Sequence, residues 1–475
     1  RAMAIVHAAI FDAVNGIDRQ YRPYLVQETA RDLNPLYSDA SVEAAVAEAA
    51  YRTLVALYPR QRVRLDEERA NALRRIPDGS PKDHGIAYGG YVADRILDAR
   101  SGDIPNTPDN YPTDTQDGVG RWQREDDPRA LRDLKGRPIE SPVTPAWGNV
   151  RAFTLTDGQV RSFRAGVLGE TRPVPDVTLA SFLDSQRYTT AFDEVKRVGR
   201  WDAEQRGDRT ADQTAIARFW SYDDNLGSTV RLYNQNVRDV VAGRPNTPQQ
   251  NAPAVALVNL AMADAGIVTW GTKYQPERDY ATNNFWRPVA GIRRAGTDDN
   301  PLTAPDADWL PLGRRVVPNA TPPHPSYTSG HASFGTATFE ILRQFYGPDD
   351  VAFTLRSEEP GGGGTRSYSS FREAQLENGV SRIYLGVHWG FDSVDGDLEG
   401  TGVADYVYRN YLTQLPSGPG ATPASVAPIL ATAGAADSIL SPPPSEGGPE
   451  FVFAPDTLTD ELLLPFARSK KKKKT

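Results

Sequence analysis

The sequence has no cysteine, so disulfide bonds, thiolate catalysis and cysteine-ligated metals are excluded. It also lacks an excess of positive charge, since the formal net charge is -8 over 475 residues. A chain with this balance is not, as a whole, a binder of nucleic acid or of anionic membranes. Chemistry on an anion therefore requires a local group of arginine and lysine side chains.

Long apolar runs are missing as well. The longest, such as residues 255–262, predict short helix faces and fall below the ~18–20 residues that cross a bilayer, so we expect no membrane span. The apolar segment at residues 2–14 carries His7 and Asp12 and lacks a small-residue cleavage site. We interpret it as a core helix rather than a signal peptide.

Alternating, strand-like segments are scarce, whereas helical periodicity recurs along most of the chain. At residues 41–58, for example, Ser41 is a candidate N-cap and Pro59 ends the run. The predicted helices span residues 41–58, 61–76, 84–99, 178–199, 208–223, 228–241, 251–270, 329–345, 371–385 and 391–411. The sequence therefore predicts an all-α fold.

Three stretches break this pattern and guide the predicted domain boundaries. Residues 105–148 predict a long irregular segment, and residues 360–365, with four successive glycines, predict a flexible loop. Residues 416–475 are rich in proline, glycine and alanine and end in five lysines, which predicts a tail with a solvated terminus. We expect a helical region at 1–209 that packs on a catalytic helical bundle at 210–415.

Histidine is also rare, with five in the chain, and three of them lie in one late part of the sequence. These are His324, His331 and His388, each with glycine, serine or proline close by. A single histidine is most often a structural residue, but three in such surroundings favour a site.

The first motif near these histidines places Arg287 directly before Pro288, which we expect to end or kink a helix. An arginine there, braced by Phe285 and Trp286, can present a fixed guanidinium fork to an oxyanion. Alone, the motif favours a surface arginine packed on aromatic rings.

The second motif runs from Pro325 through Ser329, Gly330 and His331 into a predicted helix. The N–H groups and dipole of a helix N-terminus favour an anion, and Gly330 lets the backbone approach it closely. Ser329 can donate its hydroxyl, and His331 is placed for acid–base chemistry. An N-cap serine beside an incidental histidine explains the motif equally well.

The third motif contains Arg382, His388 and Asp392. Residues four apart share a helix face, so Asp392 can hold one ring nitrogen of His388 and leave the other as a nucleophile or ligand. The alternative is an ordinary salt-bridged helix.

Taken together and in this order, the three motifs resemble the signature of the type 2 acid phosphatase (PAP2) and vanadium haloperoxidase superfamily. Residues 219–223, 233–235 and 377–389 resemble the fungal-type vanadium chloroperoxidases in particular. The resemblance covers residues 210–412 well. It implies an all-α fold of two four-helix bundles with long loops that cap the site.

The resemblance also implies a vanadate site. His388 would supply the axial nitrogen to vanadium, and His331 would act as the acid–base residue, with Asp223 hydrogen-bonded to it. The other residues implied in vanadate binding are Lys273, Arg287, Ser329, Gly330 and Arg382.

The lysine departs from the family pattern, which places it seven residues before the arginine of Arg-Pro, where this chain has Tyr280. Lys273 stands fourteen residues before Arg287, and the stretch from Trp270 to Lys273 still resembles the family's. We therefore expect a seven-residue insertion within residues 274–284. On a continuous helix the insertion would move the lysine by roughly 10 Å, so Lys273 reaches the site only if the insertion loops out.

His324 occupies a position where the fungal chloroperoxidases resemble one another in having phenylalanine, and where algal bromoperoxidases have histidine. The resemblance implies that bromide or iodide is oxidised in preference to chloride. The alternative is a loop histidine exposed to solvent.

The implied activity is vanadate-dependent oxidation of halide by hydrogen peroxide to hypohalous acid, which halogenates small organic acceptors. One alternative is a PAP2-type phosphatase that acts through a phosphohistidine at His388. Another is a non-catalytic oxyanion-binding protein, in which the displaced lysine marks an inactive site. We expect secretion or a periplasmic location because hypohalous acid harms the cell interior; the sequence leaves a homo-oligomer open.

Overall fold

The structure is a computed structural model. The residues that it describes are 1–104, 118–122, 144–166, 178–222, 229–244, 246–274, 285–313, 322, 324–347, 351–359 and 364–416. Most of the predicted irregular segment, the candidate insertion beyond Tyr274, Asp223 and the predicted tail beyond residue 416 lie outside these ranges.

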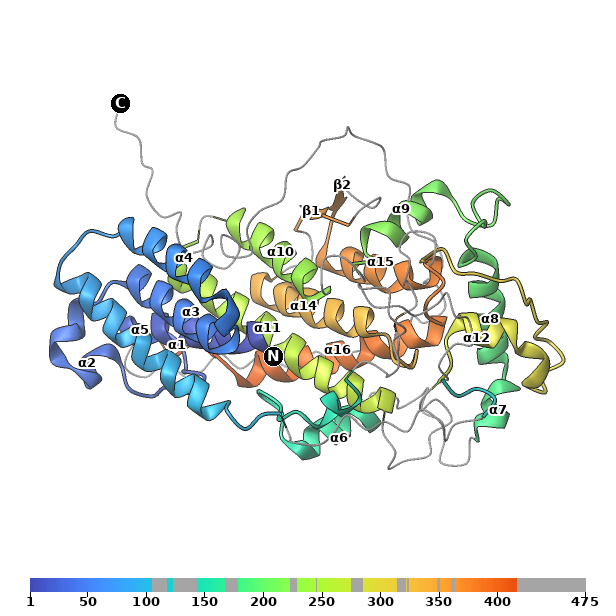
Figure 1. Ribbon diagram of the computed structural model, residues 1–475, viewed down its shortest axis with the longest axis horizontal. Helices are drawn as coiled ribbons and strands as arrows, with labels where there is room; N and C mark the ends of the chain where they lie inside the picture. Colours follow the sequence, from blue (N-terminus) through green and yellow to red (C-terminus); the bar gives the residue numbers. More distant parts are fainter. Residues whose placement is uncertain are drawn as a thin grey trace.

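The N-terminal part of the chain forms one group of helices, drawn in blue in Figure 1. The group consists of α1 (Ala2–Ile17), α3 (Val42–Leu57), α4 (Arg62–Arg74) and α5 (Ser80–Ala99). α1, α3 and α5 pack on one another, and α4 packs on α3.

The interpretation of the first apolar segment as a core helix is confirmed by the burial of α1. Asp12 of α1 is buried and accepts backbone N–H bonds from Tyr24, Leu25 and Val26 at 2.7–2.8 Å. A buried carboxylate needs such donors, so this residue fixes the chain that follows the helix.

A second group of helices contains α11 (Pro248–Tyr274), α14 (Gly330–Tyr346), α15 (Phe371–Tyr384) and α16 (Gly390–Asn410). α14 packs on the other three helices of this group, and α11 also packs on α1. α11 therefore connects the two groups, and Figure 1 shows it running between the blue helices and the orange ones. The predicted division at residue 210 stays a prediction.

Shorter elements complete the described fold. They are α2 (Ala30–Leu33), α6 (Asp157–Gly166), α7 (Leu179–Leu183), α8 (Gln186–Val198), α9 (Ala211–Phe219), α10 (Thr229–Ala242), α12 (Pro288–Arg293) and 3-10 helices at Pro35–Asp39, Pro59–Gln61, Pro145–Asn149 and Ala295–Thr297. The last part of the predicted irregular segment is thus helical. α9 is shorter than the helix predicted at 208–223, because a capping box between Thr210 and Gln213 starts it and Trp220 ends it.

The prediction of an all-α fold is confirmed, with one small addition. β1 (Phe353–Ser357) and β2 (Gly364–Tyr368) form an antiparallel pair in which Phe353 lies opposite Tyr368. The prediction of a flexible loop at residues 360–365 is wrong for residues 364 and 365, because these two residues begin β2. The alternation that buries Leu355 and Ser357 extends over only five residues, too few to be distinguished from a loop in the sequence.

The apolar helix α11 is longer than the predicted 251–270. By length and composition it could span a membrane, and it is the one such helix among the described residues. The expectation that no apolar run is long enough was therefore wrong, because Asp264 interrupts the apolar residues without ending the helix. Of the most apolar 18-residue stretch of α11, 94% is buried within the protein, as is typical of a core helix.

Candidate active site

The predicted site residues come together where several helix ends meet. The N-terminus of α14, the turn before α16, the start of α12 and the last turn of α11 all contribute side chains. This convergence brings all the predicted site residues that the structure describes to one region of the second group of helices. Asp223 is the exception, because it lies outside the described residues.

The N-terminus of α14 is held against the start of α16. The Ser329 hydroxyl caps α14 by accepting a hydrogen bond from the Ala332 N–H at 3.3 Å, as in the alternative interpretation of this motif. The Ser329 N–H itself donates to the Asp392 carbonyl at 2.9 Å. Gly330 follows as the first residue of α14, and a Cβ there would meet the Trp270 ring at 3.4 Å.

His388 and Asp392 form the predicted pair, with 2.8 Å between Nδ1 and Oδ2. From the sequence we expected both residues on one face of a helix, and this was only partly right. Asp392 lies on α16, whereas His388 lies in the turn before that helix. Asp392 is the third residue of α16, and its Oδ2 also accepts the Trp389 N–H at 3.1 Å. Nδ1–H is therefore committed to the carboxylate, which leaves Nε2 as the basic nitrogen of His388.

Arg287 lies at the opposite end of a helix from the predicted one. Pro288 starts α12 instead of ending a helix, as the fixed φ of proline favours at a first helical position, and Arg287 is the N-cap. The guanidinium donates from Nε to the His324 carbonyl at 2.7 Å and from Nη1 to the Val387 carbonyl at 3.0 Å. Arg287 is 2% exposed, so the alternative of a surface arginine is wrong.

His324 is half-buried beside the same guanidinium. Nη2 of Arg287 lies 2.7 Å from Nδ1 of His324, and the same Nδ1 lies 2.9 Å from the Pro325 carbonyl. A guanidinium only donates and a carbonyl only accepts, so the tautomer of His324 decides which of the two bonds Nδ1 makes. The imidazole ring also lies 5.4 Å from the Trp270 ring, centroid to centroid. The alternative of a loop histidine exposed to solvent is therefore wrong.

His331 and Arg382 meet at one backbone carbonyl. Nε2 of His331 lies 3.1 Å from the Trp220 carbonyl and 3.2 Å from that of Ser221, so Nε2 carries the proton. Nη1 of Arg382 lies 3.4 Å from the same Ser221 carbonyl. The hydrogen bond between Asp223 and His331 stays a prediction, and the two carbonyls fix the ring of His331 in the described part of the chain.

Lys273, in the last turn of α11, reaches the loop that precedes α14. Its Nζ lies 2.8, 2.9 and 2.5 Å from the carbonyl oxygens of Pro325, Ser326 and Thr328. An ammonium group has three N–H bonds, and these carbonyls accept all three. Lys273 thus reaches the loop that leads into Ser329, and in this geometry its donors are directed to the protein backbone.

The electrostatics of the site favour an anion. Burial, followed by the charges of Lys273, Arg287 and Arg382, lowers the pKa of His388 well below its usual value. Burial raises the pKa of Asp392 to about 7 and limits the negative charge available to balance the three cations. Burying three cations is costly unless an anion compensates them.

The chemistry of these side chains fits a vanadate or phosphate ion rather than a metal cation. Two buried guanidinium groups, a serine hydroxyl and a helix N-terminus are donors suited to oxyanion oxygens. Among the described histidines of the site, His388 is the one whose Nδ1 is held by a carboxylate, which leaves Nε2 basic, as in histidine ligands of metal centres. Within the described ranges, no group of three or more His, Asp or Glu side chains could hold a metal cation.

Residues 254–416 match the VCPO second helical-bundle domain. The chain is also 32% identical over 259 residues to vanadium chloroperoxidase from Curvularia inaequalis. That match covers 43% of this chain and 41% of the relative, less than half the length of either. Over this part of its length the chain is similar to the vanadium haloperoxidases.

Solved structures of bacterial vanadium haloperoxidases have the same fold. A bacterial vanadium-dependent iodoperoxidase superposes with a TM-score of 0.68 at 24% identity over 88% of this chain and 92% of that one. A bacterial vanadium-dependent chloroperoxidase gives a TM-score of 0.61 at 16% identity over 86% and 90% of the two chains. The fold similarity therefore extends well before residue 210, where the resemblance in sequence ended.

One buried residue beside these motifs was missed in the sequence analysis. Glu399 of α16 is fully buried and accepts hydroxyl bonds from Thr269 at 3.0 Å, Thr272 at 2.7 Å and Thr328 at 2.7 Å. It thereby joins α11 and α16 to the loop held by Lys273. The available signal was its spacing of seven residues from Asp392, which places both carboxylates on one face of a helix.

Proposed function

We propose that this protein is a vanadate-dependent haloperoxidase that oxidises halide with hydrogen peroxide to hypohalous acid. The observation that supports this most directly is the His388–Asp392 pair among three buried cations. Such a site combines a basic nitrogen with an excess of positive charge. Both are needed to hold a vanadate ion through one nitrogen and several oxygens.

The residues that would hold vanadate are His388, through Nε2, and Arg287, Arg382 and Ser329, through hydrogen bonds to oxygen. The chemistry that vanadate supplies when bound is Lewis acidity toward hydrogen peroxide. The buried guanidinium groups stabilise negative charge on the oxygens, and burial strengthens this effect because it excludes water.

His331 is the residue that would accept a proton from hydrogen peroxide. Burial, followed by the charge of Arg382, lowers its pKa well below the usual value, so the ring is neutral. Its Nε2–H is held by two carbonyls, which leaves Nδ1 as the basic atom. A neutral base at this position can take up the proton without first losing one.

We further propose that bromide or iodide is oxidised in preference to chloride. When Nδ1 of His324 is unprotonated, it accepts a hydrogen bond from Nη2 of Arg287 at 2.7 Å and so diverts one N–H of that guanidinium from the anion; the protonated Nδ1 would donate to the Pro325 carbonyl instead. Weaker donation to the anion lowers the oxidising power of the site, and chloride is the hardest of the three halides to oxidise. The acceptors of the resulting hypohalous acid are small organic molecules.

The proposed activity is tested by replacing the vanadium ligand. His388→Ala is expected to abolish vanadate-dependent bromide oxidation, because no other described side chain offers a basic nitrogen at that position. The matched control is His84→Ala on α5, whose ring is paired with Asp39 at 2.6 Å. Full bromide oxidation by His388→Ala would refute the proposed site.

A phosphatase is the second candidate function, because the same guanidinium groups would bind phosphate and Nε2 of His388 could attack phosphorus. The Asp392 contact orients the His388 ring for either reaction.

The expectation that the protein is exported from the cytoplasm stays a prediction.

A further inference from the structure

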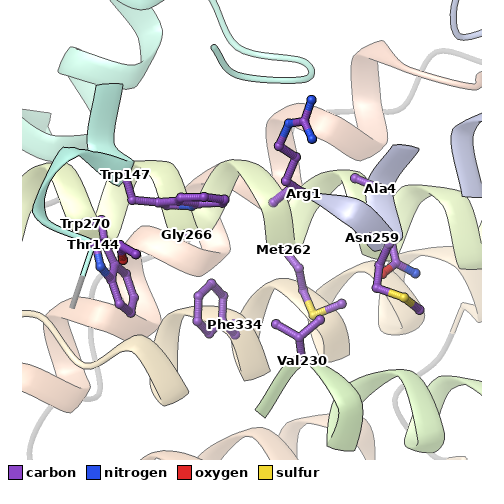
Figure 2. A pocket seen from close by; sticks show the side chains of 12 residues that line it. Arg1, Ala4, Thr144, Trp147, Val230, Asn259, Met262, Gly266, Trp270 and Phe334 are labelled. Atoms are coloured by element: carbon purple, nitrogen blue, oxygen red, sulfur yellow. The ribbon is translucent and has the colours of Figure 1, made fainter. Parts of the chain in front are cut away.

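An apolar pocket lies beside the proposed vanadate site. Its volume is about 280 Å³, at the lower end of the ~300–1,000 Å³ of ligand pockets. Figure 2 shows the rings of Trp147, Trp270 and Phe334 around one end of it. Its lining includes Trp147, Asn259, Met262, Ala263, Trp270 and Phe334, together with the charged Arg1.

The lining suits a flat, apolar ligand. Trp147, Trp270 and Phe334 are only half-buried, so their rings retain apolar surface that a ligand could cover. The chain has just two methionines, Met3 and Met262, and both line this pocket. Thioether side chains adapt to ligands of irregular shape and contact aromatic rings favourably.

Two helices lead from this pocket to the vanadate site. Along α11, the lining residues Asn259, Ala263, Gly266 and Trp270 follow helical spacing, and Lys273 comes one turn later on the same face. Three residues of a helix correspond to about 4.5 Å, so the pocket ends close to Lys273.

α14 makes the same connection from the opposite side. Phe334 lines the pocket, and its ring stacks on Trp270 with 6.2 Å between centroids. Gly330 precedes it by one turn, at the proposed anion site. Trp270 also contacts His324, so a single indole separates the pocket from this histidine of the proposed site.

Among the polar residues of the lining, Asn259 indicates how a ligand would be oriented, whereas the Arg1 guanidinium already donates to Asp103 and to the Arg100 carbonyl. Asn259 is 2% exposed, and its Oδ1 has no hydrogen-bond partner among the described residues. Its Nδ2 donates to Asn234 Oδ1 at 2.9 Å and to the Val255 carbonyl at 3.0 Å. A buried acceptor of this kind favours a ligand with a hydroxyl or N–H donor.

We propose that this pocket binds the organic acceptor, an aromatic molecule of one or two rings that bears a hydroxyl or ring N–H. The proposal rests on the proposed function for its source of hypohalous acid. In the reaction, the electrophilic halogen of hypohalous acid replaces a ring hydrogen, and that proton leaves with the hydroxide as water. Electron-rich rings of this class react readily, and binding beside Trp270 places the ring close to where the oxidant forms.

The test uses 2-naphthol as the probe and Ala263→Leu to fill the pocket. The bromination rate of the wild-type protein is expected to saturate with 2-naphthol. Ala263→Leu is expected to raise the KM for 2-naphthol about tenfold or more, because added methyl groups occupy the space of the ligand. Each KM is compared with iodide oxidation by the same variant, a reaction that needs no organic acceptor. The matched control, Ala72→Leu, changes a half-buried alanine on α4.

Calorimetric titration with 2-naphthol, without vanadate or halide, measures binding separately from turnover. We expect saturable binding that Ala263→Leu weakens and Ala72→Leu does not. Two results would overturn the proposal that this pocket binds the acceptor. One is a bromination rate that never saturates with 2-naphthol, and the other is a KM and a Kd for 2-naphthol that Ala263→Leu leaves unchanged. A wild-type protein that oxidises no halide yet binds 2-naphthol in this pocket would refute the proposed function and support the pocket.

Discussion

Lys273 holds the loop that leads into Ser329, because its amine donates to three carbonyls of that loop. Burial, followed by the charge of Arg287, lowers its pKa, while the carboxylates of Asp392 and Glu399 oppose this shift. The three acceptors match the three N–H bonds of the charged amine. We therefore assign Lys273 a positioning role, in addition to its charge near the anion.

Replacing Lys273 tests that role. Lys273→Met should lower the free energy of unfolding by about 3 kcal/mol or more, because it leaves three buried carbonyls without a donor at ~1–3 kcal/mol each. Urea denaturation measures the change, with Lys82→Met in a surface pair with Asp78 as the control. A Lys273→Met protein as stable as wild type, with greatly weakened vanadate binding, would show that the amine contacts the anion instead.

His324 offers a second test with a single side chain. His324→Phe removes the ring nitrogen that lies 2.7 Å from Nη2 of Arg287, so this N–H becomes available to the anion. One hydrogen bond to a charged group is worth ~1.5–3 kcal/mol, so the ratio of chloride to bromide turnover should rise by about tenfold. Steady-state rates with each halide at saturating peroxide and vanadate give the ratio. An unchanged ratio would remove His324 from halide selection.

The identity of the site residues could be predicted from the sequence, but several of their contacts could not. Spacing alone predicted that Asp392 would hold His388, and the two side chains are 2.8 Å apart. Contacts to backbone carbonyls, such as those of Lys273 and His331, depend on loop conformation, which residue types do not encode locally. Glu399 was missed for the same reason, since its threonine partners come from α11 and a distant loop.

At the scale of elements, α14 and α16 pack so closely that only glycine fits between them. A Cβ on Gly396 would lie 2.6 Å from the Ser329 carbonyl oxygen, and one on Gly400 would lie 2.5 Å from that of Ser333. Both contacts are with the backbone of α14, which cannot move aside without shifting the Ser329 N-terminus. This packing positions the α14 N-terminus against His388.

Gly396→Ala and Gly400→Ala should each destabilise the protein by about 1–3 kcal/mol, as overpacking does in a tight core. Gly379→Ala in α15 is the control, because a Cβ there meets nothing within 4 Å. That change should be neutral or stabilise the helix by ~0.5–1 kcal/mol. Thermal or urea denaturation measures all three variants. Equal stability of the three would contradict the close packing of α14 on α16.

Helix ends were the elements that sequence patterns predicted least well. Pro288 was expected to end a helix but begins α12, since proline suits both places and only the following residues distinguish them. α11 was predicted at residues 251–270 and extends beyond both ends, over Pro248–Tyr274. Within it Asp264 is buried and accepts the N–H bonds of Phe153 and Thr154 at 2.6 and 2.7 Å.

At the scale of the whole molecule, α11 packs on both groups of helices and supplies Lys273 to the site and Trp270 to the wall of the pocket. The N-terminal group, through α1, thus supports the helix on which the lysine stands. The all-α class followed from the sequence, because helical periodicity is a local property. The packing of α1 on α11 joins residues more than 200 positions apart, and no local pattern encodes such a contact.

The central claim is that the buried cations and His388 hold vanadate for halide oxidation. It is tested most directly by titrating the vanadate-free protein with orthovanadate in phosphate-free buffer while measuring bromination of a phenolic dye with hydrogen peroxide and bromide. We predict a rate that rises from zero and saturates with vanadate. Absence of bromination, together with phosphomonoester hydrolysis that vanadate inhibits, would contradict the claim and establish the phosphatase; absence of both would leave an inactive oxyanion site.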